Sequence, residues 1–80
     1  MATEPAQAGQ GILAVFGECS IRPGEMLVHG LLHPAFLSKG FRDEDWTHGL
    51  TWLIGQGFIE IVQNRPLSYF LTEKGFAQIE

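Results

Sequence analysis

The chain has 80 residues, with nine acidic and five basic side chains and a formal net charge of −4. This length suits one small domain and excludes large catalytic scaffolds such as a dinucleotide-binding sheet or a β/α barrel. Hydrophobic residues make up 45% of the chain, which argues against disorder throughout, and charged residues make up only 18%. The acidic balance also argues against a surface dedicated to nucleic acid, which is normally rich in lysine and arginine.

The single cysteine, Cys19, excludes an intramolecular disulfide and fits a reducing compartment. The first residues lack the basic and apolar regions of a signal peptide. The apolar runs are much shorter than the roughly 18 residues that a membrane span needs. We therefore expect a cytoplasmic domain that does not enter a membrane.

The first half of the chain predicts a flexible tail over residues 1–8, followed by one domain over residues 9–80. A helix is expected over residues 10–19, where apolar residues recur at helical spacing, and a turn at residues 22–24. A second helix is expected over residues 25–33, with an apolar stripe formed by Leu27, Val28, Leu31 and Leu32. Pro34 then either ends this helix or opens a short one that continues to Ser38.

The third helix has the clearest pattern. Asp43 is the expected N-cap, and Gly57 is the expected residue after the last turn. One face should be buried because its apolar residues fall at helical spacing, and these are Trp46, Leu50, Leu53 and Ile54.

After Gly57 the apolar residues alternate, which predicts a β-hairpin. Its strands are expected over residues 58–63 and 67–71, with a turn at residues 64–66. Thr72 is expected to cap a last short helix that continues to Ile79.

This order of elements predicts a winged helix-turn-helix domain of α+β class, with three to four helices, a two-stranded hairpin wing and a short C-terminal helix. A more specific likeness lies in the leucine-bearing third helix that ends at Gly57 before an apolar pair. A Tyr-x-Leu-Thr-x-x-Gly pattern follows the hairpin, formed by Tyr69, Leu71, Thr72 and Gly75. Over residues 42–79 the chain resembles MarR- and PadR-like regulators.

The resemblance implies DNA binding, with the third helix in the major groove and the wing on the backbone or the minor groove. The residues that would contact DNA are Arg42, Thr47, His48, Thr51 and Arg65. The third helix, however, opens with Asp43, Glu44 and Asp45, whose carboxylates would face the phosphates. DNA affinity depends largely on neutralising phosphates, so we treat a DNA-binding regulator as the alternative function.

Our leading hypothesis is a non-catalytic module that binds a protein, or a second copy of itself, through the outer face of the third helix. A helical wheel places Trp52 off the apolar stripe, and aromatic anchors are common at protein interfaces. The expected contact residues are Trp52, His48, Asp45, Glu44 and Thr51. Packing of Trp52 against the first or second helix, or under the wing, is an equal alternative.

No motif supports catalysis, a cofactor or a metal. The Gly-x-Gly-x-x-Ala run that begins at Gly9 has no strand before it, which a dinucleotide site requires. His29 and His33 have zinc-like spacing, with His48 as a conceivable third ligand, but a full ligand set is missing. Nothing brings a base to Cys19. We expect a protein that is not an enzyme, and we interpret His29 and His33 as partly solvated surface residues.

Overall fold

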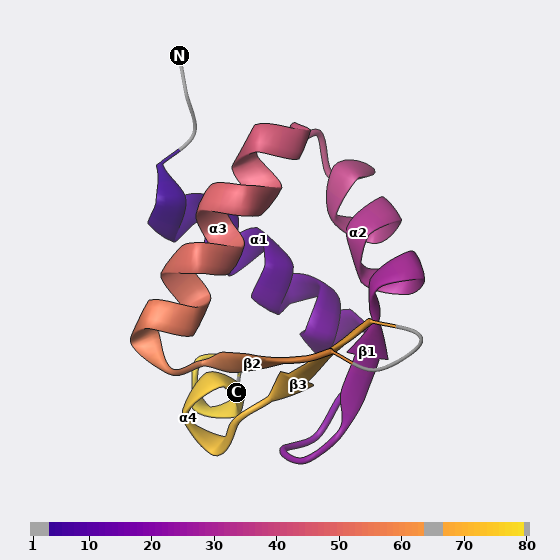
Figure 1. Ribbon diagram of the computed structural model, residues 1–80, viewed down its shortest axis with the longest axis vertical. Coiled ribbons are helices and arrows are strands. Elements are labelled where there is room, and N and C mark those ends of the chain that lie inside the picture. The colour runs from indigo at the N-terminus through magenta and orange to yellow at the C-terminus, as the bar shows by residue number, and fades with distance from the viewer. Residues whose placement is uncertain (1–3, 64–66, 80) are drawn as a thin grey trace.

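Three helices lie on one side of a small antiparallel sheet (Figure 1), in a computed structural model that describes residues 4–63 and 67–79. No helix in these two ranges is long and apolar enough to cross a membrane. The elements in chain order are α1 (Pro5–Glu18), β1 (Met26–Val28), α2 (His29–Leu37), α3 (Asp43–Gln56), β2 (Ile59–Val62), β3 (Ser68–Leu71) and α4 (Glu73–Ala77).

The sheet has the strand order β1-β3-β2, and both neighbouring pairs are antiparallel. Tyr69 lies in the middle strand, opposite Leu27 of β1 and Ile61 of β2. Because side chains alternate along a strand, Tyr69 faces the helices while Phe70 and Glu60 face the other side. The predicted α+β class and β-hairpin are confirmed, and the arrangement is compatible with a small winged-helix domain. The predicted turn at residues 64–66 lies outside the described residues.

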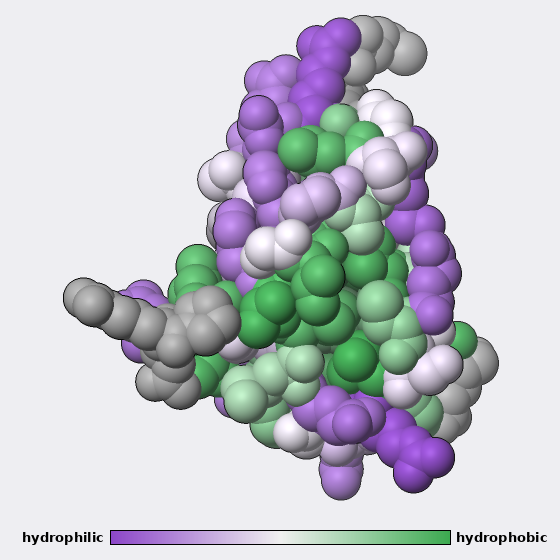
Figure 2. Space-filling model, turned by 90° about the vertical axis from the view of Figure 1, so that its right-hand side faces the viewer, coloured by the Kyte–Doolittle hydropathy of each residue, from purple (hydrophilic) through white to green (hydrophobic). Residues whose placement is uncertain are grey.

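The prediction of a helix over residues 25–33 was wrong. Residues 26–28 form β1, and α2 begins only at His29 and continues past Pro34 to Leu37. Leu27 is buried, whereas Leu31 is 64% exposed. A short apolar run does not distinguish a helix from a strand, and pairing with β3 decides the outcome here. Figure 2 shows hydrophobic side chains gathered on the side of the molecule where α2 and β1 lie.

The predicted tail was also too long, because α1 already begins at Pro5. Proline suits the first position of a helix, where its missing N–H is not needed. Ala8 is fully buried against α3. At this contact Gly49 lies so close to α1 that a Cβ atom on it would be 2.8 Å from the backbone of Ala8 and Gly9. The small residues therefore let the two helix backbones approach each other.

Both ends of α3 have local stabilising contacts. The N-cap is Arg42, not the expected Asp43, and its backbone N–H donates to the Asp45 carboxylate at 2.9 Å. Gly57 ends the helix with a φ of 77°, as predicted. Along the helix Trp46 and Leu53 are buried as expected, but Leu50 is half-buried and Ile54 is 41% exposed.

The last predicted helix is confirmed at its start. The Thr72 hydroxyl accepts a hydrogen bond from the Gly75 backbone N–H at 3.0 Å, which caps α4. The Thr72 hydroxyl also lies within donating distance of the backbone carbonyls of Gly57 and Phe58, which immediately precede β2. The cap thus attaches the C-terminal helix to the sheet.

Two glycines of α3 provide a matched test of the α1–α3 contact. We expect Gly49→Ala to destabilise the fold by about 1–3 kcal/mol or more, because its methyl group would meet backbone atoms of α1. Gly55→Ala should instead stabilise the fold by about 0.5–1 kcal/mol, since nothing lies within 4 Å of the new Cβ and alanine favours helix. Urea unfolding of both variants measures the difference. Equal effects would contradict the close approach.

Candidate functional site

The outer face of α3 is formed by side chains that recur every three or four residues and are exposed. They are Glu44, Thr47, His48, Thr51 and Ile54, and we call this set the α3 face. The Thr51 hydroxyl donates to the Thr47 backbone carbonyl at 2.8 Å, so it is partly occupied within the helix. The face is thus neutral over most of its length and acidic at its start.

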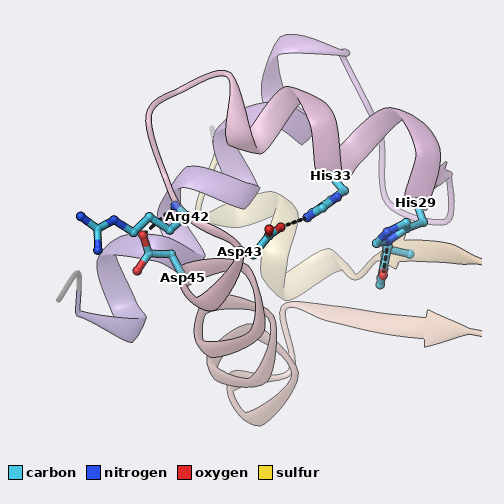
Figure 3. A network of polar contacts seen from close by, with 6 residues as sticks. His29, His33, Arg42, Asp43 and Asp45 are labelled. Carbon is cyan, nitrogen blue, oxygen red and sulfur yellow. Dashed lines mark hydrogen bonds and ion pairs between the residues drawn. The ribbon is translucent and has the colours of Figure 1, made fainter.

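Asp45 does not belong to this face, contrary to our expectation. It is only 5% exposed, and its carboxylate accepts the backbone N–H of Arg42. It therefore acts in helix capping, and Figure 3 shows it beside Arg42, turned away from Asp43. Glu44 remains 65% exposed along its side chain, with one oxygen 3.6 Å from the Arg42 guanidinium.

Trp52 lies at the margin of the α3 face and packs inward. A Cβ atom on Gly9 of α1 would be 2.4 Å from the Trp52 ring, so the ring lies directly over this glycine. The ring also meets Phe58 edge to face, with 5.6 Å between centroids. Packing against the first helix, one of the two alternatives open from the sequence, is therefore what the structure shows. The exposed apolar group of the α3 face is Ile54.

The two basic residues near the start of α3 are opposite carboxylates. Arg42 faces Glu44, and the Lys39 ammonium pairs with the Glu18 carboxylate. Arg65, expected at the wing tip, lies outside the described residues. Of the residues expected to contact DNA, the structure therefore brings together Thr47, His48 and Thr51 on the α3 face, and none of these is a lysine or an arginine.

A second polar group of residues joins α2, α3 and β3 (Figure 3). The rings of His29 and His33 stack with 4.9 Å between centroids and 16° between planes. His29 Nδ1 is hydrogen-bonded to the Tyr69 hydroxyl at 2.8 Å, and His33 Nε2 donates to Asp43 Oδ1 at 3.0 Å. The Trp46 ring meets both imidazoles at steep angles, 79° and 69° between planes, with 5.5 and 5.0 Å between centroids. We call His29, His33, Asp43, Trp46 and Tyr69 the histidine cluster.

Sequence reasoning placed these histidines on one helix face but missed their partners. Both are half-buried and hydrogen-bonded, so the interpretation as partly solvated surface residues covers only part of their setting. The spacing of four residues between the two histidines was the signal that the sequence offered. Their hydrogen-bonding partners, Tyr69 and Asp43, belong to β3 and α3. Across residues 4–63 and 67–79, no three His, Cys, Asp or Glu side chains gather as metal ligands.

Burial raises the pKa of the Tyr69 hydroxyl above its ordinary value of 10.0. The phenol lies under the helices in the middle strand, where little water reaches a phenolate. Tyr69 is therefore a neutral hydrogen-bond partner for His29 over the whole physiological range.

Two surface hollows lie away from both groups of residues, and the larger, of about 540 Å³, lies between the turn at Pro23 and the start of α4. The smaller, of about 320 Å³, is lined by side chains of α1 and the C-terminal segment, namely Gln10, Leu13, Ala14, Gln78 and Ile79. None of these side chains titrates near neutral pH, so this hollow supplies no acid–base pair.

Comparison with protein-family models, with curated proteins and with solved structures finds no match for this chain. The functional argument therefore depends on the geometry of the α3 face and of the histidine cluster.

Substitution of Trp52 tests its packing role. We expect Trp52→Ala to destabilise the fold by about 2–4 kcal/mol, because it uncovers Gly9 and Phe58 and removes most of a large aromatic contact. Trp52→Phe keeps part of the ring packing and should lose less than half of the stability that Trp52→Ala loses. Thermal unfolding compares them. An unchanged midpoint in Trp52→Ala would contradict the packing assignment.

Titration of Tyr69 should be visible in stability at high pH. The unfolded chain releases the phenolic proton near pH 10.0, whereas the folded chain holds it longer. Stability is therefore fully present below that pH and is lost as the pH rises from 10.0 through the raised pKa. We expect Tyr69→Phe to remove this part of the alkaline loss, as measured by unfolding at several pH values. The same alkaline slope in both proteins would show that Tyr69 does not contribute.

Proposed function

We propose that this chain is a non-catalytic interaction module of winged-helix type that binds a protein segment through the α3 face. The observation that carries the proposal is the chemistry of α3, whose 14 residues include three acidic side chains and no lysine or arginine. The helix that a DNA reader of this type would insert into the major groove thus lacks the charge that phosphates require.

The surroundings of α3 support the same conclusion. Neutralising a phosphate needs an available cation, and a lysine or arginine already paired with a carboxylate must give up that pair. Lys39 and Arg42 lie near the start of α3 and face Glu18 and Glu44, whereas Lys74 lies near its end with its ammonium over the Phe58 ring. DNA binding is the alternative, and it would depend on replacing these pairs by phosphate contacts.

The exposed groups also indicate the kind of partner. Asp43 and Glu44 leave 82% and 65% of their side chains exposed at the start of α3, and Ile54 exposes an apolar group three turns later. A segment with basic residues at one end and apolar residues at the other would match both features. Two copies of this face packed side by side would bring carboxylates together, so a different protein fits better than a second copy.

A synthetic amphipathic helix of lysine, leucine and alanine serves as the probe for this face. We expect Glu44→Gln and Ile54→Ala each to weaken probe binding by about three- to tenfold, because one removes a charge pair and the other an apolar contact. Glu60→Gln and Met26→Ala are matched controls, since both residues are exposed on the far side of the sheet. Fluorescence anisotropy with the labelled probe measures the affinities.

Random-sequence duplex DNA separates the two functions. We expect binding no tighter than the roughly 10⁻⁶–10⁻⁴ M of non-specific complexes at physiological salt. Tighter binding that Arg42→Gln abolishes would establish the DNA-binding alternative. Equal weakening of probe binding by the α3-face variants and by the controls would overturn the proposed face.

A further inference from the structure

The outward side of α2 lacks the charged side chains that a surface helix normally presents to water. Every residue of α2 is described, and none is Asp, Glu, Lys or Arg. Leu31 is the large apolar side chain on this side, and it is 64% exposed. Its neighbours on the same side are short, and together they form the α2 face, which consists of Gly30, Leu31, Pro34, Ala35 and Ser38.

The polar groups of this helix do not supply the α2 face with contacts to water. Both histidines turn the other way, toward Tyr69 and Asp43 (Figure 3). The Ser38 hydroxyl donates to the backbone carbonyl of Ala35 at 2.7 Å. Figure 2 looks at this side of the molecule and shows hydrophobic side chains gathered there. Exposed apolar surface of this kind is typical of a contact with another protein.

The distribution of charge indicates which protein covers the α2 face. The chain has a formal net charge of −4, so two copies repel each other unless they meet where neither presents a carboxylate. Residues 26–38 form such a stretch, since they include no Asp, Glu, Lys or Arg. The α3 face differs, because it carries the Glu44 carboxylate. A charged partner gains nothing from the α2 face, whereas a second copy brings a matching uncharged surface.

The sizes of the side chains also suit a contact between two copies. Leu31 projects beside Gly30, where a Cβ atom would have nothing within 4 Å. When two α2 helices lie antiparallel about a two-fold axis, Leu31 of each copy enters the hollow over Pro34 and Ala35 of the other. The same contact is thus made twice, and the two helix dipoles oppose each other favourably.

We propose that this chain forms a homodimer in which two α2 faces pack antiparallel about a two-fold axis. None of the α3-face residues takes part, so the inference does not rest on the proposed function. The nine residues of α2 span about 14 Å, which is short for the roughly 800 Å² that each partner buries in a standard interface. The dimer is therefore weak, with an expected Kd of about 10⁻⁵–10⁻³ M.

Sedimentation equilibrium of the full chain at concentrations up to about 1 mM measures this association. We expect Leu31→Lys to weaken it at least about tenfold, because the lysine brings a charge into an apolar contact. Ile54→Lys is the matched control, since it makes the same change of charge at an exposed apolar residue of α3. It should keep the wild-type Kd within about twofold, because Ile54 lies outside the α2 face.

Two results would overturn the dimer. A chain that stays monomeric at about 1 mM would leave the α2 face to a different protein. Equal weakening by Leu31→Lys and Ile54→Lys would show that the copies associate elsewhere. Thermal unfolding of both variants verifies that they fold, which the exposure of both side chains leads us to expect.

Mixing two variants tests the antiparallel arrangement. Pro34→Glu should weaken self-association, because Leu31 of one copy would meet a carboxylate of the other. In a mixture of Leu31→Lys with Pro34→Glu, one contact pairs the lysine with the glutamate, and the other restores Leu31 on Pro34. We expect the mixture to associate within about threefold of the wild-type affinity, although each variant alone does not. A mixture that associates no more tightly than the separate variants would overturn the two-fold contact.

Discussion

The close approach of α1 and α3 is the contact on which the rest of the domain depends. It exists because Ala8, Gly9 and Gly49 leave no side-chain bulk between the two backbones. This contact turns Trp52 over Gly9 and toward Phe58, and it thereby connects the end of α3 to the sheet. The α3 face is consequently what remains exposed after the opposite side of the helix has been buried.

The charge on α3 then follows from how the helix begins. Three successive acidic residues favour the positive end of the helix dipole, and each has a different role in the fold. Asp45 caps the helix, Asp43 bonds His33, and Glu44 stays on the surface near Arg42. The three acidic residues look like a single acidic patch in the sequence. In the structure, one caps the helix, one bonds a histidine, and one lies on the exposed α3 face. This division leaves Glu44 as the carboxylate of the α3 face.

Local signals in the sequence predicted two element ends that are decided locally, although they misplaced the N-cap of α3, which is Arg42 and not Asp43. Gly57 with its positive φ and the capping Thr72 were both predicted, because each depends on residues close by in the chain. The strand β1 was not, since its partner β3 comes much later and an apolar triplet suits either a helix or a strand. The same reason explains the histidine cluster, where the spacing of His29 and His33 was visible but Tyr69 and Asp43 come from other elements. The inward packing of Trp52 required knowledge that Gly9 lies beneath it.

The central place of β3 has a consequence for the order in which the chain can fold. β3 is the last strand in sequence, yet β1 and β2 both pair with it and with no other strand of the described sheet. During synthesis, α1, α2 and α3 leave the ribosome before any strand that could complete the sheet. The backbone of β1 therefore stays without its pairing strand until residues 68–71 have been made. Long-range pairing of this kind slows folding and leaves apolar surface exposed meanwhile, so the helical half of the nascent chain is the part most in need of protection by chaperones.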